Sequence, residues 1–381
     1  MIAPRASFVA AVEGRLRPFL SHLPPSLLVR LYSRGRSTFL GTFASSRPRR
    51  AYSPEGLGRT LWGLRFQAPL MNAAGMFKKG EGYAVVARQG AGAYLAGTTT
   101  HRPRRGNRRC GVATPFAPYP RSGAASNWLG LPNPGHAAVA RRLGRVRRVD
   151  GCPVGASVTA DPEPGVAEAQ RLDELVAGMG LYAEAGVDFL EMNESCPNTE
   201  AEEATFEGLL ERLQVVSDRF LGPKTADRRR PPVVVKFSCD TELERVPELV
   251  DALLDLGYDG VNFGNTSTAY GALRSQIRPA EQGTYDYFVK TFGGGVSGRP
   301  LKELSLSLAS VAVARVAEKA GDREFHVLRT GGVETAADLR ASAHGGIPMT
   351  QWYSGYFDAF ADHGHDVYRR IFDGLAGPPP A

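Results

Sequence analysis

From about residue 61 onward, short apolar runs alternate with longer segments whose apolar residues recur at helical spacing. Eight runs read as buried strands: Pro69–Ala73, Ala93–Gly97, Pro153–Val158, Phe189–Met192, Val233–Phe237, Gly260–Phe263, His326–Leu328 and Met349–Trp352. Amphipathic segments follow most of them: Glu168–Ala185, Phe206–Phe220, Glu242–Leu256, Leu301–Ala320 and Thr335–Ala343. Regular alternation of strand and helix predicts an α/β protein, a parallel (β/α)8 TIM barrel.

The first 45 residues follow a different pattern. Residues 6–43 predict two amphipathic helices broken at Pro24-Pro25, with arginines interleaved among the apolar positions. A basic amphipathic hairpin suits a membrane surface, and a helical pair packed on its own domain explains the periodicity equally well. We therefore divide the chain into a helical extension (1–45), a linker (46–60), a barrel (61–375) and a C-terminal tail (376–381).

The lengths of the apolar runs and the spacing of the cysteines argue against a membrane-spanning, a secreted and a metal-binding protein. No apolar run reaches 18 residues and the N-terminus lacks a secretory signal, so a cytoplasmic protein is expected, with a peripheral place on the inner face of the cell membrane as the alternative. The four cysteines form no Cys-x-x-Cys pair, which argues against zinc and iron–sulfur sites. No metal is expected.

The net charge of +7 is unevenly distributed. Residues 1–66 hold eleven arginines and two acids, and residues 101–148 hold eleven arginines and no acid. Such asymmetry suits nucleic acid, anionic lipid or an anionic substrate. Solvated surface arginines explain many of these positions, and we expect no specific nucleic-acid partner.

Small, hydroxyl-bearing and charged residues stand directly after the apolar runs, where a barrel builds its active site. They include Ala74, Gly75, Thr98, Ser157, Lys236, Asn265, Thr266, Gly331, Gly332, Tyr353 and Ser354. Two glycine-containing turns that enter helices late in a barrel can direct their N–H groups at a phosphate. Together these turns favour a phosphorylated cofactor.

Lys236 stands at the mouth of a buried strand, after three valines. An unpaired ammonium at such a place would be costly. We expect a negatively charged cofactor to supply its partner.

The stretch from Asn193 to Thr199 follows another buried strand. It places the thiol of Cys196 between Asn193 and Asn198 and stiffens it with Pro197. A thiolate whose pKa is lowered by nearby donors is a competent base near neutral pH. A small buried filler is the alternative for this cysteine.

Several blocks together resemble the dihydroorotate dehydrogenase family of FMN-dependent (β/α)8 barrels, over roughly residues 61–375. They are Asn193–Asn198, Asn127–Asn133, Gly97-Thr98 with Pro103 and Gly106-Asn107, Gly294–Lys302 and Thr330–Thr335. The resemblance implies oxidation of (S)-dihydroorotate to orotate in pyrimidine biosynthesis. The proton passes to Cys196 and the hydride to N5 of FMN.

The same resemblance implies two groups of binding residues. The substrate group is Lys78, Asn127, Leu131, Asn193, Asn198, Asn265 and Thr266. The FMN group is Ala74, Gly75, Thr98, Ser157, Asn193, Lys236, Gly298, Gly331, Gly332, Tyr353 and Ser354. Lys236 is similar to the lysine that stabilises negative charge on the reduced ring.

The electron acceptor is left open by mixed features. A cysteine base resembles the soluble class that reduces fumarate, whereas the N-terminal extension and Lys78 resemble the membrane-associated class that reduces quinone. The basic helical hairpin favours quinone. Another dihydropyrimidine substrate, suggested by the acidic run at Glu200–Glu203, and a non-catalytic flavin- or nucleic-acid-binding paralogue are the alternatives.

Overall fold

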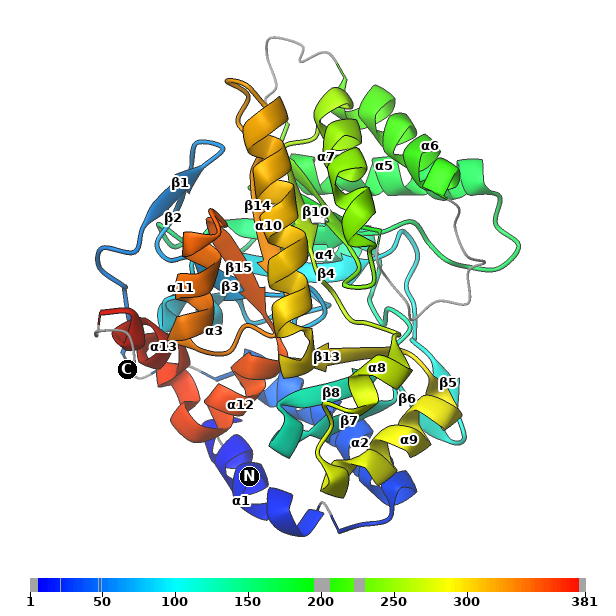
Figure 1. Ribbon diagram of the computed structural model, residues 1–381, viewed down its shortest axis with the longest axis vertical. Helices are drawn as coiled ribbons and strands as arrows, with labels where there is room; N and C mark the ends of the chain where they lie inside the picture. The colour runs from blue at the N-terminus through cyan, green and yellow to red at the C-terminus, as the bar shows by residue number, and fades with distance from the viewer. Residues whose placement is uncertain are drawn as a thin grey trace.

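The computed structural model describes residues 6–20, 22–46, 48, 50–194, 206–222 and 230–376. Parallel strands form its centre (Figure 1). There are eight, and they follow one another around the barrel in the order in which they occur in the chain. They are β3 (Leu70–Asn72), β4 (Tyr94–Thr99), β9 (Val154–Val158), β10 (Phe189–Asn193), β11 (Val233–Phe237), β12 (Gly260–Phe263), β14 (His326–Thr330) and β15 (Met349–Trp352). Every strand predicted from the sequence is present, and the predicted TIM barrel is confirmed.

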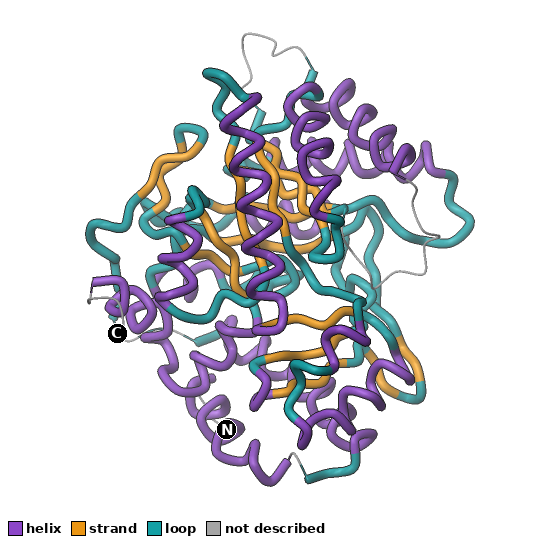
Figure 2. The backbone as a smooth tube through the Cα atoms, in the orientation of Figure 1, coloured by secondary structure: helices purple, strands orange, loops and turns teal. Residues whose placement is uncertain are grey.

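Helices surround the strands, as the backbone trace in Figure 2 shows. They are α3 (Tyr83–Gln89), α4 (His136–Leu143), α5 (Glu168–Glu184), α6 (Phe206–Val216), α7 (Val246–Asp255), α10 (Lys302–Lys319), α11 (Ala336–His344), α12 (Ser354–His363) and α13 (Val367–Ala376). The five helical segments predicted within the barrel are confirmed. Thr335 caps α11 by accepting from the Asp338 N–H, while the Asp338 carboxylate accepts from the Thr335 N–H, so this helix begins with a capping box.

A side chain completes the seam between β3 and β4. The Asn72 amide donates to the Leu95 carbonyl at 2.7 Å and accepts from the Leu95 N–H at 3.2 Å. Beyond the strand ends, the Gly75 N–H donates to the Gly97 carbonyl at 2.6 Å. The Asn72 side chain therefore supplies two hydrogen bonds between β3 and β4 that a strand backbone would otherwise form, and in this way it closes the barrel.

The end of the barrel where the strands begin is filled by apolar side chains. A hairpin of β1 (Arg59–Leu61) and β2 (Leu64–Phe66) contributes Leu61 and Phe66, which pack with the inward-facing Phe189 and Met349. We call these four residues the apolar plug. All four are nearly or fully buried, so the plug closes this end of the barrel.

The opposite end, where the strands finish, carries an insertion that the sequence pattern did not predict. Its antiparallel sheet has the order β13 (Gly295–Gly298), β8 (Ala124–Asn127) and β7 (Phe116–Tyr119). A small hairpin, β5 (Arg108–Arg109) with β6 (Val112–Ala113), and the helices α8 (Tyr270–Arg274) and α9 (Pro279–Phe292) accompany it (Figure 1). This sheet brings Asn127 over the ends of the barrel strands.

The two predicted N-terminal helices are present as α1 (Ala6–Leu20) and α2 (Pro25–Ala44). Figure 1 shows them at the same end of the molecule as the antiparallel sheet. α1 packs beside α12, where Arg17 contacts Asp358 at 3.0 Å. α2 packs against β7 and α9, and its Phe43 stacks on Phe77 with ring centroids 5.6 Å apart. Within the part of the chain that the structure describes, no helix is long and apolar enough to cross a membrane.

Candidate active site

A cavity opens at the C-terminal ends of the barrel strands, beneath β13 and β8; together with the open solvent at its mouth, its empty space is about 930 Å³. Fifteen of the predicted site residues line it: Ala74, Gly75, Lys78, Thr98, Asn127, Leu131, Asn193, Lys236, Asn265, Thr266, Gly298, Gly331, Gly332, Tyr353 and Ser354. Ser157 does not line the cavity itself but contacts a residue that does, because its hydroxyl lies 3.0 Å from that of Thr98. Cys196 and Asn198 lie outside the described residues.

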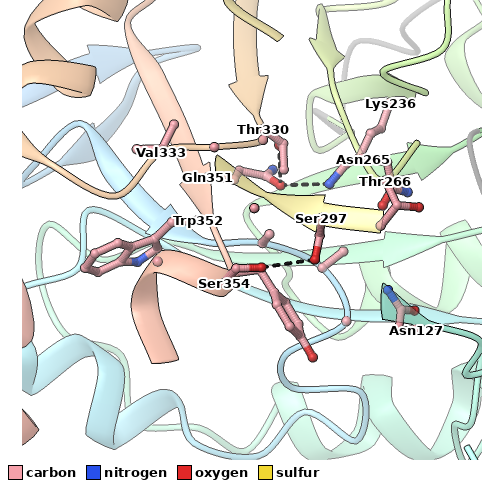
Figure 3. Close-up of a pocket in the computed structure, with 18 of the residues that line it drawn as sticks. Asn127, Lys236, Asn265, Thr266, Ser297, Thr330, Val333, Gln351, Trp352 and Ser354 are labelled. Atoms are coloured by element: carbon pink, nitrogen blue, oxygen red, sulfur yellow. Dashed lines mark hydrogen bonds between the residues drawn. The ribbon is translucent and has the colours of Figure 1, made fainter. Parts of the chain in front are cut away.

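Amide-bearing residues and the start of α12 lie on different sides of the cavity. Figure 3 shows Asn127, Asn265 and Thr266 together on one side, whereas Ser354 and Val333 lie on the other. The amide-bearing side is joined to the barrel wall by Asn193, whose amide donates to the Thr98 hydroxyl at 2.9 Å. One side is thus suited to a small polar ring and the other to a group bound by backbone N–H donors.

Thr266 is the best indicator of a polar ligand on the amide-bearing side. Its hydroxyl is buried and has no hydrogen-bond partner among the described residues. A Cβ at position 295 would lie 1.9 Å from this hydroxyl, so Gly295 is needed for the two segments to meet. A buried hydroxyl without a partner is costly, and a bound ligand would satisfy it.

The glycine-rich side combines two turns. Gly331 and Gly332 follow β14 with φ values of 122° and 69°, a conformation that residues with a Cβ rarely adopt. Opposite them, α12 begins at Ser354, whose hydroxyl lies 3.0 Å from that of Ser297 (Figure 3). The N–H groups in the first turn of a helix have no partner within it and favour an anion.

Lys236 forms the floor of the cavity, where two side chains of the barrel contact it. Its ammonium donates to Gln351 Oε1 at 3.0 Å (Figure 3) and lies 3.7 Å from Glu191 Oε1. Burial lowers the pKa of Lys236, and the nearby Glu191 carboxylate opposes that shift. The sequence predicts a negatively charged cofactor as the partner of Lys236, and the chain itself supplies two further partners, one from β10 and one from β15.

A helix of the N-terminal extension also reaches the cavity wall. The Arg36 guanidinium on α2 donates to the Tyr353 hydroxyl at 2.9 Å and to the Gly75 carbonyl at 3.1 Å. Both acceptors belong to residues that line the cavity. The helix pair is therefore fixed to the site and does not merely cover the barrel.

Several lining residues were missed from the sequence: Ala73, Leu129, Ser297, Arg299, Thr330, Val333, Glu334, Gln351, Trp352 and Gly355. Most are neighbours of predicted residues. Gln351 matters most, because it contacts Lys236 and its amide donates to Glu191 Oε2 at 2.6 Å. The alternation of inward and outward positions along Met349–Trp352 was the signal for it.

The sequence profile described as dihydroorotate dehydrogenase matches residues 56–377. The dihydroorotate dehydrogenase (quinone) of Parvibaculum lavamentivorans is 30% identical over 94% of this chain and 92% of its own length. The enzyme of the same name from Mycobacterium marinum is 29% identical over 96% and 94%.

Among solved structures, the dihydroorotate dehydrogenase of Eimeria tenella in complex with ferulenol superposes with a TM-score of 0.71. It covers 90% of both chains at 22% sequence identity, a likeness of fold. The profile match spans most of the chain, and the identity to the bacterial enzymes extends over nearly all of it. The chain therefore belongs to the dihydroorotate dehydrogenase family, whose members are flavin-dependent oxidoreductases.

Proposed function

We propose that this protein oxidises (S)-dihydroorotate to orotate, with FMN as the flavin and a quinone as the final electron acceptor. The observation that carries the proposal is the two-sided cavity, which places amide and hydroxyl side chains opposite glycine-rich turns above a buried lysine. The names of the curated relatives support both the substrate and the acceptor.

The residues present fit FMN. The turn at Gly331-Gly332 and the first turn of α12 offer backbone donors suited to the phosphate. Lys236 offers a buried cation, and Ala74 and Gly75 leave room for a flat ring. When bound, the flavin would supply the chemistry of hydride acceptance, which no side chain provides.

The substrate would lie on the amide-bearing side. A dihydropyrimidinedione presents both donors and acceptors in one plane, which the amides of Asn127, Asn193 and Asn265 can match. The Thr266 hydroxyl would gain its missing partner. Lys78 would attract the carboxylate, because an ammonium is the natural partner of that group.

Cys196 is proposed as the base that removes the C5 proton. Replacing it with alanine should leave the bound flavin and its yellow colour intact while slowing flavin reduction by dihydroorotate by about 10²- to 10⁴-fold. Stopped-flow absorbance under anaerobic conditions measures this rate. The exposed Cys110 provides the matched control, since Cys110→Ala should reduce at the wild-type rate. Near wild-type reduction by Cys196→Ala would remove the residue from the mechanism.

A peripheral membrane location is proposed from an apolar stripe on the N-terminal helices. Phe8, Val12, Leu16 and Phe19 recur along one face of α1, and Phe8 and Phe19 are 64% and 73% exposed. Leu27 and Leu31 on α2 are also exposed. We call these six residues the apolar stripe. Exposed aromatic and aliphatic side chains beside arginines suit the interface of an anionic bilayer.

The double variant Phe8→Ser/Phe19→Ser should lose binding to vesicles that contain phosphatidylglycerol. It should also lose reduction of a long-chain quinone held in them, while dihydroorotate still reduces its flavin. The control Val149→Ser removes an exposed apolar side chain elsewhere and should change neither. Unchanged quinone reduction by the double variant would contradict the docking surface. Reoxidation of wild-type flavin by fumarate but not by quinone would contradict the acceptor.

A further inference from the structure

Glu191 is a buried carboxylate inside the barrel, one layer beneath the cavity. It points inward from β10 between Phe189 and Asn193, and it is 1% exposed. Its Oε2 accepts from Asn262 Nδ2 at 2.9 Å and from Gln351 Nε2 at 2.6 Å. Its Oε1 has no hydrogen-bond partner among the described residues and lies 3.7 Å from the Lys236 ammonium.

This arrangement holds the carboxylate in one orientation. Both neutral donors bind the same oxygen, so the other oxygen remains directed toward Lys236. The Thr330 hydroxyl lies 3.0 Å from both Asn262 Oδ1 and Gln351 Oε1, which fixes the two amides in turn. The polar layer is therefore connected from β10 through β12, β14 and β15 back to Lys236 on β11.

Other charges near Lys236 do not replace Glu191. Burial raises the pKa of the Cys239 thiol to about 12, so this group is neutral at physiological pH. Glu191 is the only acid in an ion pair with Lys236 within the described ranges. The pair is nearly inaccessible to water, where charges interact strongly and an uncompensated charge is expensive.

We propose that Glu191 is a positioning residue that acts through Lys236, compensating its charge and thereby holding the reduction potential of the bound flavin low. The inference rests on the proposed function, because it requires a flavin above Lys236. When two electrons and one proton enter a flavin, the ring gains one negative charge. An uncompensated lysine would favour that reduced form, whereas a lysine paired with Glu191 favours it less.

The consequence concerns the second half of the reaction. A flavin of lower potential passes its electrons more readily to an acceptor. Glu191 would thus set how easily the reduced enzyme is reoxidised without touching substrate, acceptor or flavin.

The test compares midpoint potentials of the full-length protein loaded with FMN, measured by spectroelectrochemistry without substrate. In Glu191→Gln, the side-chain oxygen can still accept from Asn262 and Gln351, so the variant removes the charge and keeps the shape. Its midpoint potential should shift to more positive values than that of the wild type. Glu191→Asp keeps the charge further from Lys236 and should shift the potential in the same direction by less.

Glu194→Gln is the matched control. Glu194 lies three residues away and its side chain is 6% exposed, but its carboxylate pairs with Arg212 at 3.0 Å and does not line the cavity. The control should retain a potential close to that of the wild type. An equal positive shift in both glutamine variants would overturn the proposal, because it would reflect the net charge of the chain.

Two further outcomes separate this inference from the proposed function. A wild-type protein that binds no FMN would refute the proposed function itself. A flavin-loaded Glu191→Gln with the wild-type potential would refute only the inference about Glu191. If Glu191→Gln cannot be isolated with flavin, an unchanged potential in Glu191→Asp would overturn the inference.

Discussion

Two layers of the barrel interior lie one above the other on the same strands, yet they are built on opposite principles. On β10 the inward positions change from Phe189 to Glu191, and on β15 they change from Met349 to Gln351. The lower layer is the apolar plug, which packs beneath the hairpin of β1 and β2. The upper layer is polar and forms the floor of the cavity.

The difference between the two layers shows which of them tolerates substitution better. Apolar contacts have no direction, so the plug needs only suitable shape and volume. In the polar layer, the amides of Asn262 and Gln351 both donate to the Glu191 carboxylate, so the loss of that acceptor leaves buried donors unsatisfied. Function is therefore tied to the layer that is least tolerant of substitution.

Replacing Lys236 with methionine should have the largest effect. The variant leaves Glu191 buried without its cation, which should cost about 3–5 kcal/mol of unfolding free energy, and it should lose FMN. Urea unfolding of the flavin-free protein and fluorescence of released flavin measure the two effects.

The double variant Lys236→Met/Glu191→Gln sharpens this result. It removes both charges, so most of the unfolding free energy should return while FMN remains weakly bound. If the double variant is as unstable as Lys236→Met, the loss comes from packing, and the ion pair is not what stabilises this layer.

Deprotonation of Lys236 at high pH should also release flavin, as in Lys236→Met, but this release should be reversible. Burial lowers the pKa of this lysine and Glu191 only partly opposes the shift, so the folded-state pKa lies below the ordinary value. Flavin should stay bound at pH values below the lowered pKa, where Lys236 is charged. It should be released as the pH rises through the lowered pKa, before surface lysines lose their protons near about 10.4.

Filtration of the holoenzyme between about pH 7 and about pH 11 measures the flavin retained. Circular dichroism over the same range tests whether the fold persists. Lys78→Gln is the control, because Lys78 also lines the cavity. A release curve that disappears in that variant would assign the titration to Lys78.

The smallest effects should distinguish the two layers directly. Met349→Leu in the apolar plug should cost less than about 1.5 kcal/mol and leave the flavin spectrum unchanged. Gln351→Leu, at the next inward position of β15, should cost about 1–3 kcal/mol for each group it leaves unsatisfied. Urea unfolding of both variants makes the comparison. Equal costs would show that the two layers tolerate substitution alike.

Much of the barrel could be predicted because its strands are short, continuous apolar runs, as strands buried on both faces must be. The ends of those runs identified most of the cavity wall, since parallel strands bring their C-terminal ends together. Strands such as β8 and β13 could not be predicted, because Ala124–Asn127 and Gly295–Gly298 are rich in small residues and carry no apolar alternation.

Glu191 was missed for another reason. It was treated as part of an apolar run, although an acid two positions before Asn193 must face the same side of the strand. Its partner Gln351 comes from a strand far along the chain, and only the closed barrel brings the two together. The alternation of residues along a strand shows which side chains face the barrel interior. Which of those side chains contact one another across the interior depends on how the barrel closes.

The strands that close the barrel, β3 and β15, are synthesised far apart in time, which affects how the chain folds. The first barrel strand, β3, pairs with the last, β15, with the Thr350 hydroxyl donating to the Pro69 carbonyl across 281 positions. Arg17 on the first helix likewise meets Asp358 across 341 positions. The earlier of these paired segments must therefore wait for the later one to be synthesised. Until β15 and α12 have been synthesised, the edge of β3 and the face of α1 that packs on α12 lack their native partners, and unpaired edges of this kind are prone to aggregation.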